Sequence, residues 1–436
     1  ISKEKFMQNA DWVNYLKLRA AYGSVGNDAA AGAYASYNRY YLTTYDKVGI
    51  AIPYSVAADN VKWESTNTLD VALEGSLFND RFTFSIGYYN KRNADLLYNV
   101  NLPISAGNVL TNGAMIQVLK NVGTMENQGW ELQFGVDIIR NRNFKWNFNI
   151  DASFLKNKVV KLPDGKDIVG QALFQGKSRY EHYLYTWAGV DRATGNSLYK
   201  MEPNSPDYWE YDANGKHVYN ESAYLSKLKA AKASGHYFEI DGEGYTDQTQ
   251  YAGRQVQGTS LPTVYGSFGT NLSWKGLNFS MLFTYSLGGK TYNGIYASLM
   301  GVSSQGAPSA LHKDNLKSWT EPNGVQNADG TWQHIIDPNG VPVNDTELSQ
   351  YNNSGSSRFL FSSNYLTLKN INLNYDFPKK WVNALKLQNI NVGVSIDNLF
   401  IATTKKGMNP QYSFGGGQGN YFMPARVFNF SLAFKF

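Results

Sequence analysis

The sequence predicts an all-β protein, a transmembrane antiparallel β-barrel with long extracellular loops and short periplasmic turns. Three observations support this fold class: apolar and polar residues alternate along many segments, short connections alternate with long ones, and aromatic residues gather beside the short connections. Alternation alone would equally suit a soluble β-sandwich, which also buries one face of every strand. The other two observations favour the barrel, for which we count about twelve strands.

The alternating segments follow one another along the whole chain. In each, the apolar side chains fall on one face of an extended strand and the polar ones on the other. A weaker hairpin spans residues 183–199 and turns at residues 191–195. The clear alternating segments are residues 16–22, 69–73, 82–88, 130–138, 144–154, 264–274, 277–285, 371–377, 390–396 and 428–436.

The last segment is the most apolar on one face and ends on an aromatic residue. Asn429, Ser431, Ala433 and Lys435 occupy its other face. We interpret this segment as the closing strand of the barrel, because a closed barrel leaves no strand edge in lipid. The residues expected to matter for barrel assembly are Phe430, Leu432, Phe434 and Phe436.

Connections differ in length in the way expected of an outer-membrane barrel. The short ones are residues 78–81, 140–144, 274–277 and 378–387, and the long ones are residues 99–115, 201–262, 291–357 and 403–424. Within the long loops, residues 221–235 and 309–319 are expected to form short helices. The aromatic residues beside the short connections are Phe82, Phe144, Trp146, Trp274, Tyr375, Phe377, Phe434 and Phe436, as in an interfacial girdle.

Composition excludes several classes of protein. The 436 residues include 40 Lys and Arg against 35 Asp and Glu, so no basic cluster suggests nucleic-acid binding. The chain has no cysteine, which excludes disulfides and thiolate metal sites, and no apolar run long enough for a transmembrane helix. The first residue is Ile1 and no signal peptide is visible, so we expect that secretion has removed one.

Few motifs suggest a metal or an enzyme. Asp241, Glu243 and Asp247 place three carboxylates among glycines, which would suit loop-bound Ca²⁺, although the spacing is not that of an EF-hand. No other cofactor is expected. Ser178 and His182 are close in sequence, as a Ser–His hydrolase would need, but spacing gives no geometry, and no catalytic residues are assigned.

Several segments resemble one known family in shared order over nearly the whole chain. They are residues 16–27 (LKLRAAYGSVGN), 63–74 (WESTNTLDVALE), 87–97 (GYYNKRNADLL), 121–132 (NVGTMENQGWEL), 188–195 (AGVDRATG), 319–323 (WTEPN), 365–378 (YLTLKNINLNYDFP), 397–400 (DNLF) and the terminal Phe. With these segments, the chain is similar to the C-terminal barrel of SusC/RagA-type TonB-dependent transporters of Bacteroidetes. One departure is Asn409 before Pro410, where the family more often has an acidic residue.

The resemblance implies a barrel of about 22 strands around an N-terminal plug domain. Residues 1–436 would then be the C-terminal part of the barrel, with about 12 strands, and the plug and the signal peptide would lie upstream of Ile1. It implies a bacterial outer-membrane location with a periplasmic C-terminus. The implied partners are outer-membrane lipid, TonB through the plug region, and a SusD-like surface lipoprotein that closes the barrel as a lid. A dimer of such pairs is a further arrangement that the resemblance allows.

The function implied by the resemblance is energised import of large nutrients, oligosaccharides first and oligopeptides as the alternative. A family barrel kept as a scaffold in a larger surface complex is a second hypothesis, and an outer-membrane hydrolase is a third. A lumen lined by polar residues such as Asn370 and Asn372 would suit hydrated solutes, and aromatic loops would suit stacking on sugar rings. The candidate substrate-contact or lid-contact residues are Tyr208, Trp209, Tyr211, Tyr292, Tyr296, Trp332, Asn370 and Asn372.

Overall fold

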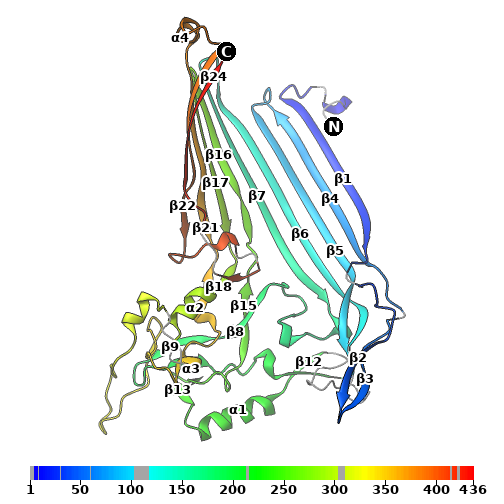
Figure 1. The fold of residues 1–436 in the computed structure, drawn as a ribbon, viewed down its shortest axis with the longest axis vertical. Coiled ribbons are helices and arrows are strands. Elements are labelled where there is room, and N and C mark those ends of the chain that lie inside the picture. Colours follow the sequence, from blue (N-terminus) through cyan, green and yellow to red (C-terminus); the bar gives the residue numbers. More distant parts are fainter. Residues whose placement is uncertain are drawn as a thin grey trace. The chain divides into compact units, whose positions relative to one another are not determined.

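The computed structural model describes residues 4–7, 9–29, 31–58, 60–102, 117–212, 216–302, 310–412, 415–419 and 423–436. These residues form two compact units, residues 1–179 and residues 180–436, each of which is described by itself. Long antiparallel strands dominate both units, and helices are few and short (Figure 1). The prediction of an all-β antiparallel architecture is confirmed.

In the first unit, long strands pair in the order β1-β4-β5-β6-β7. Every pair in this series is antiparallel. A hairpin of β2 and β3 joins the same sheet, because β3 pairs with the beginning of β6. The elements are η1 (Lys5–Met7), β1 (Val13–Asn27), β2 (Arg39–Tyr45), β3 (Val48–Val56), β4 (Glu64–Leu77), β5 (Phe82–Asn101), β6 (Gln117–Arg140), β7 (Phe144–Lys161), η3 (Pro163–Gly165) and η4 (Val169–Gln171).

The short connections of this unit are tight turns, as predicted. Between β4 and β5, the residues Phe78, Asn79 and Asp80 all have positive φ. The guanidinium of Arg140, at the end of β6, donates to the carbonyl oxygen of Asn79 over 2.9 Å. The strands reach 24 residues in β6, well beyond the roughly 9–11 that cross a bilayer. Strand β6 is thus longer than a bilayer crossing requires.

In the second unit, the long strands pair in the order β16-β17-β21-β22-β24, again antiparallel. The turn between β16 and β17 needs Gly276, where φ is +90° and a Cβ would lie 2.5 Å from the carbonyl oxygen of Asp376. A short helix, α4 (Lys379–Ala384), lies in the connection from β21 to β22. The strands are β16 (Val264–Trp274), β17 (Leu277–Leu287), β21 (Tyr365–Asp376), β22 (Asn389–Thr403) and β24 (Val427–Lys435).

At the other end of these strands, residues 180–263, 288–364 and 404–426 form what we call the loop domain. The hairpin predicted at residues 183–199 is present in part: β9 (Trp187–Asp191) pairs with β10 (Ser197–Lys200), whereas residues 183–185 belong to β8, which pairs with β15. The elements of the loop domain are β8 (Glu181–Tyr185), β9 (Trp187–Asp191), β10 (Ser197–Lys200), η5 (Pro206–Tyr208), β11 (Trp209–Tyr211), β12 (His217–Tyr219), α1 (Glu221–Ala233), β13 (Phe238–Ile240), β14 (Glu243–Thr246), β15 (Arg254–Thr259), β18 (Lys290–Asn293), α2 (Gly294–Met300), η6 (Lys313–Lys317), β19 (Ile336–Asp337), α3 (Ser349–Asn352), η7 (Ser357–Phe359), β20 (Leu360–Ser362), η8 (Pro410–Tyr412) and β23 (Gly417–Gln418).

The two predicted loop helices have different outcomes. Helix α1 forms as expected: Asn220 caps its N-terminus by accepting from the amide of Ala223, and Gly235 follows its end with φ of +77°. The helix expected at residues 309–319 is shorter, a 3-10 helix at Lys313–Lys317. His312 caps this segment through its ring nitrogen, and the chain leaves it in extended conformation at Ser318.

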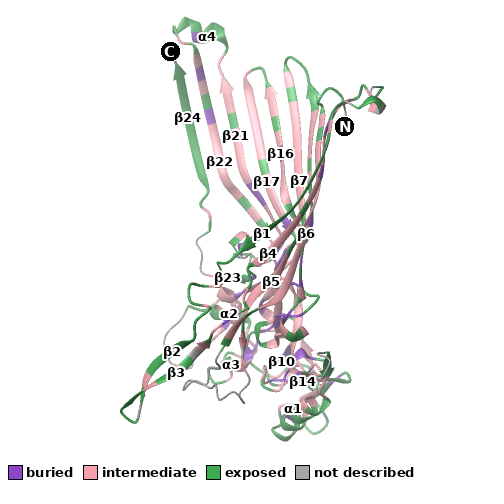
Figure 2. Cartoon of the chain, turned by 90° about the vertical axis from the view of Figure 1, so that its right-hand side faces the viewer, coloured by how far each residue is buried: buried purple, intermediate pink, exposed green. Residues whose placement is uncertain are grey.

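The tightly packed core of the second unit lies in the loop domain. Tyr199, Leu198 and Phe359 have no exposed surface. The strands, in contrast, are mostly half-buried, and every residue of β24 is exposed (Figure 2). Among the described residues, no helix combines the length and apolar character needed to cross a membrane.

Candidate functional site

Asparagine and aspartate side chains form a ladder on one face of β21 and β22. Nδ2 of Asn370 donates to Oδ1 of Asp397 over 2.7 Å, and Nδ2 of Asn374 donates to Oδ1 of Asn372 over 2.9 Å. The predicted lumen residues Asn370 and Asn372 are therefore brought together on one face. The ladder keeps these amides oriented and leaves their remaining hydrogen-bonding capacity for a hydrated solute.

Asp376 accepts hydrogen bonds from a second group of amides near the short-turn end of this face. Its Oδ1 accepts from Nδ2 of Asn391 over 2.8 Å and, more weakly, from Nδ2 of Asn389 over 3.4 Å. Nδ2 of Asn278 on β17 reaches its Oδ2 over 3.4 Å. The face is thus rich in amides with few charges, which suits uncharged polar solutes.

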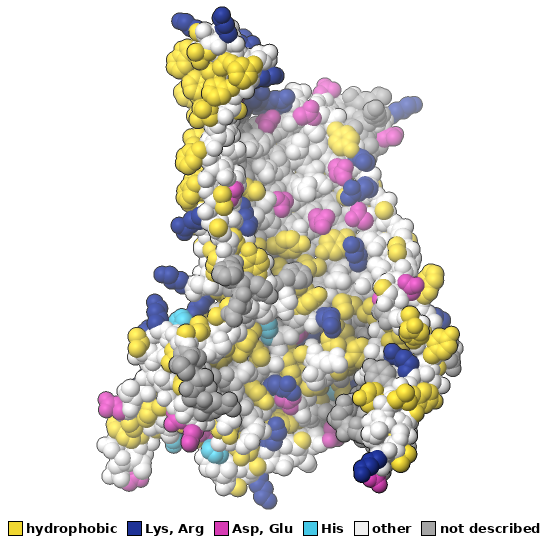
Figure 3. All heavy atoms as spheres, in the orientation of Figure 1, with side chains coloured by type: hydrophobic (Ala, Val, Ile, Leu, Met, Phe, Trp, Pro, Cys, Tyr) yellow, Lys and Arg dark blue, Asp and Glu magenta, His cyan; other side chains and the backbone are white. Residues whose placement is uncertain are grey.

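The opposite face of the same strands is apolar. Phe430, Leu432 and Phe434 on β24 lie opposite Val394, Val392 and Ile390 on β22, so the residues predicted to share a face do so. Phe430 keeps 80% of its surface exposed. Hydrophobic side chains also gather around α4 and the end of β24, with Lys and Arg beside them (Figure 3). This arrangement is expected where an apolar face enters lipid near an interface.

A bulge in β21 changes which residues share the polar face. Pairing with β17 and with β22 shifts at Lys369, between Leu368 and Asn370. On the N-terminal side of the bulge, the odd-numbered residues of β21 lie on the polar face. Thr367, for example, lies opposite Thr284 of β17. Sequence reasoning missed this change of phase, although the apolar residues change at Lys369 from even positions (Leu366, Leu368) to odd ones (Ile371, Leu373).

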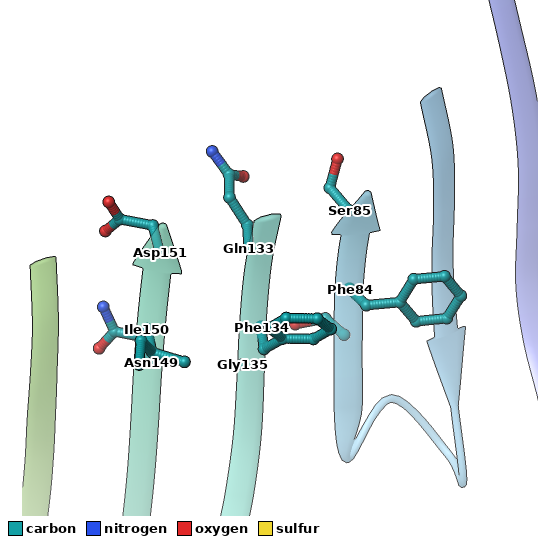
Figure 4. Close-up of a pocket in the computed structure, with 9 residues that line it drawn as sticks. Phe84, Ser85, Gln133, Phe134, Gly135, Asn149, Ile150 and Asp151 are labelled. Atoms are coloured by element: carbon teal, nitrogen blue, oxygen red, sulfur yellow. The ribbon is translucent and has the colours of Figure 1, made fainter. Parts of the chain in front are cut away.

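The first unit also has a polar face, with a shallow cavity of about 360 Å³ over β5, β6 and β7. Ser85, Gln133 and Asp151 are paired in register and point the same way from three neighbouring strands (Figure 4). In the next row, Gly135 lies between Thr83 and Asn149 and leaves the hollow, since a Cβ there would lie 2.7 Å from Oγ1 of Thr83.

Tyr292 and Tyr296, two predicted contact residues, belong to an aromatic cluster in the loop domain. Both rings pack edge-on against the buried Phe359, at centroid distances of 6.1 and 6.0 Å. The hydroxyl of Tyr296 donates to Asp314 over 2.8 Å, and Nζ of Lys405 lies 3.9 Å from its ring centre. Burial, together with the bond to Asp314, raises the pKa of Tyr296 to about 12. The ring of Tyr296 is therefore engaged by the protein itself.

The other predicted aromatic residues also pack within the loops. Tyr208 is only 3% exposed, and burial raises the pKa of its hydroxyl. Trp209 stacks on His217 at 4.2 Å in the β11–β12 hairpin, to which Tyr211 also belongs. Trp332 is half-buried and forms an isolated bridge with Gln326. Whether any of them meets a ligand or a lid protein stays a prediction.

Two of the three carboxylates proposed for Ca²⁺, Glu243 and Asp247, form ion pairs within the protein. Asp241 lies in the tight turn between β13 and β14, Glu243 pairs with Lys200 at 3.1 Å, and Asp247 pairs with His236 at 2.8 Å. Within the described ranges, no group of three or more His, Asp or Glu side chains is placed to hold a metal ion. These contacts give the calcium hypothesis no support, and it stays a prediction.

Ser178 and His182 each have a structural partner. Oγ of the buried Ser178 donates to Asn157 over 3.1 Å. Nε2 of His182 donates to the carbonyl oxygen of Lys290 over 3.0 Å, and burial lowers the pKa of the imidazole. With its Nε2 proton held by that carbonyl, His182 shows no contact typical of a catalytic base.

The sequence matches the family model described as "TonB dependent receptor-like, beta-barrel" over residues 9–225. TonB-dependent receptor P39 of Formosa agariphila is 28% identical, over 97% of this chain and 40% of its own length. TonB-dependent receptor SusC of Bacteroides thetaiotaomicron is 24% identical, over 100% of this chain and 39% of its own length. The chain thus spans about two fifths of the length of these relatives.

Among solved structures, the RagAB peptide transporter is similar in fold. It shares 20% sequence identity and a TM-score of 0.68, covering 99% of this chain and 42% of the solved one. The RagAB peptide importer in an "open-open" state gives a TM-score of 0.69 at 18% identity, over 99% of this chain and 41% of that chain. At these identities, the likeness concerns the fold alone.

Proposed function

Because the chain belongs to the TonB-dependent receptor β-barrel family, we propose that it supplies wall and loops to an outer-membrane importer of the SusC/RagA type. The observation that supports the proposal is the pairing of two opposite faces on the same strands. One face carries the ladder that joins Asn370 to Asp397, and the other presents Phe430 and Leu432. A strand in a membrane wall needs both, an apolar face toward lipid and a polar face toward a hydrated passage.

Oligosaccharides are the substrate class that we favour. The ladder offers neutral amides, which donate and accept hydrogen bonds as sugar hydroxyls do. Among the charged residues of this face, Asp376 and Asp397 are contacted by amides, and Lys435 lies opposite Asn389 at the short-turn end. Oligopeptides are the alternative, since the structurally similar RagAB is named a peptide transporter.

The proposed partners are a SusD-like surface lipoprotein and TonB, the latter through a plug region outside this chain. The loop domain supports the first proposal, because its packed core would give a lid protein a rigid surface to meet. Helix α1 and the β11–β12 hairpin present apolar side chains to the surroundings, with Val218 and Leu225 about half exposed. In this arrangement, the loop domain lies outside the cell and the C-terminus lies in the periplasm.

The proposal is tested by purifying the complete gene product that contains this chain from outer membranes in mild detergent. Mass spectrometry should find a surface lipoprotein with it, and glycan analysis should find bound oligosaccharide. Co-purifying peptides would instead favour the oligopeptide importer. A product that purifies alone and whose deletion leaves nutrient uptake unchanged would contradict the importer and favour a scaffold.

A further inference from the structure

The polar face of the second unit ends in a cavity of about 210 Å³ beneath the loop domain. Its floor is one row of paired residues, in which Ser286 of β17 lies between Tyr265 of β16 and Tyr365 of β21. Because neighbouring strands are about 4.8 Å apart, the two tyrosine backbones are about 10 Å apart with a small residue between them. The row thus places two aromatic side chains on either side of a gap.

The gap has room for one flat ring. Atoms in contact lie about 3.5–4 Å apart, so a ring between two aromatic side chains needs about 7–8 Å. The ring of Tyr265 is accessible, with 42% of the residue exposed. At about 210 Å³ the cavity is smaller than the roughly 300–1,000 Å³ of pockets that enclose a whole small molecule, so it would hold one sugar ring rather than a longer segment.

The rim of the cavity is fixed by a glycine turn. Gly288 and Gly289 both have positive φ, and a Cβ on Gly289 would lie 2.7 Å from the carbonyl oxygen of Ser260. Oγ of Ser363 donates to the carbonyl oxygen of Gly288 over 3.1 Å. Ser260 and Ser363 both line the cavity and are more than nine-tenths buried. The rim is therefore held in place by backbone contacts rather than by accessible, mobile side chains.

The lining is uncharged and mixes aromatic rings and prolines with a few hydroxyl and amide groups. Among the described residues it consists of Ser260, Pro262, Tyr265, Ser286, Ser363, Tyr365, Pro410 and Gln411. Such a lining offers hydroxyl and amide groups to hydroxyls and aromatic faces to C–H groups. A charged peptide terminus or side chain would lose hydration here without an opposite charge to compensate.

A second cavity, of about 280 Å³, shares Gln411 with the first and has one charged lining residue among those described, Arg426. It is lined by Thr367 and Asn409, each only 2% exposed. The hydroxyl of Thr367 and the amide nitrogen of Asn409 have no hydrogen-bond partner in the described part of the chain. Both backbone and side-chain nitrogens of Gln411 donate to Oδ1 of Asn409 over 3.2 Å, which holds Gln411 between the cavities.

We propose that the cavity between Tyr265 and Tyr365 binds one uncharged sugar ring of an oligosaccharide, with Gln411 between that ring and the next. This inference rests on the proposed import function and deepens it by placing the substrate class at a defined site. The second cavity would receive the neighbouring sugar unit, and Thr367 and Asn409 supply polar groups at its base. The site marks the loop-domain end of the polar face.

The test uses the complete transporter, purified in detergent, and a library of neutral, fluorescently labelled hexose oligosaccharides. Tyr265→Ala should weaken binding of the best oligosaccharide about tenfold, and Tyr265→Phe should bind nearly as well as the wild type because the ring remains. Tyr412→Ala is the matched control, since Tyr412 is 49% exposed next to Gln411 but does not line this cavity. Heat-modifiable migration on gels checks that each variant is folded.

Each outcome decides a different question. An oligosaccharide whose affinity falls with Tyr265→Ala and not with Tyr412→Ala supports the site. An oligosaccharide that binds Tyr265→Ala with the same affinity as the wild type overturns the site and leaves the import function standing. A wild type that binds end-blocked short peptides and no oligosaccharide overturns the assignment of a sugar ring. A wild type that binds neither class contradicts the proposed function itself.

Discussion

The second unit has two regions that are built in opposite ways: the loop domain, and the sheet of long strands β16, β17, β21, β22 and β24, which we call the wall. The loop domain is packed like a small globular protein, with Tyr199, Leu198 and Phe359 entirely buried. In the wall, aromatic residues such as Phe430 remain exposed, and long hydrogen-bonded pairings supply most of the contacts. Burial between side chains stabilises the first region, whereas the second has an apolar face that only lipid would cover.

This contrast teaches that loop aromatics and wall aromatics are not equivalent. In the loops, Tyr208 and Tyr296 are used for packing and for hydrogen bonds within the domain. On the wall, Tyr265 is accessible on the polar face and Phe430 on the apolar face. Residues that meet the surroundings are therefore found along the strands as much as in the loops. Four substitutions separate the two regions, in order of decreasing expected effect.

Phe359→Ala should damage the loop domain and spare the wall. Truncating a fully buried phenylalanine costs about 3–5 kcal/mol, because the cavity left behind collapses only in part. Limited proteolysis should cut the loop domain much faster in this variant while heat-modifiable migration stays normal. Leu316→Ala, at a position 90% exposed, is the control and should change neither. Loss of heat-modifiable protein in Phe359→Ala would show that the two regions are not separable.

Phe430→Arg should do the reverse, damaging the wall first. A cation on the lipid face near the bilayer midplane costs about 2–4 kcal/mol in a membrane barrel. The amount of heat-modifiable protein in the outer membrane should fall clearly. Asn429→Lys, one residue away on the polar face, should be tolerated. Equal loss in both variants would argue against an apolar face directed at lipid.

Asp207→Asn should weaken the loop domain in a pH-dependent way. Burial alone would raise the pKa of Asp207, but hydrogen bonds from Arg254, the shortest at 2.7 Å, hold it below its ordinary value of 3.8. The carboxylate therefore stabilises the folded domain above pH 3.8, and this contribution is lost as the pH falls through the lowered pKa. Thermal unfolding should show a loss of about 1–3 kcal/mol at pH 7. The difference between variant and wild type should shrink near pH 3, and a constant difference would contradict the ion pair as its source.

Asn220→Ala should have the smallest effect, about 1 kcal/mol, confined to helix α1. The side chain of Asn220 accepts from the amide of Ala223 over 3.0 Å and so caps the helix. Hydrogen exchange of the first turn should become faster. Asn220→Ser keeps a capping oxygen and should restore most of the protection. If serine restores nothing, the contact of Asn220 with Glu210 matters more than the cap.

Sequence reasoning predicted the wall well, because apolar and polar residues alternate along a strand whose two faces meet different surroundings. The pairing of Phe430 with Val394 follows from it. So does the tight turn at residues 78–81, whose Asn and Asp tolerate positive φ. The bulge at Lys369 was missed, although two adjacent polar residues, Lys369 and Asn370, interrupt the alternation there.

The loops were predicted less well, because their structure depends on contacts between distant segments. Phe359 meets Tyr296, 63 positions earlier in the chain, and no local pattern indicates that contact. Tyr208 was expected to be available and is buried. The cavity at Tyr265 and Tyr365 arises from the pairing register of three strands, so it became visible only once that register was known.

The central claim, that the wall separates an exterior loop domain from periplasmic turns, is tested most directly by labelling single cysteines, since this chain has none of its own. Leu316→Cys in the loop domain and Lys380→Cys in α4 would be treated with a membrane-impermeant maleimide on intact cells. We predict that the first is labelled at once and the second only after the outer membrane is permeabilised. Immediate labelling of both, or of Lys380→Cys alone, would contradict the account.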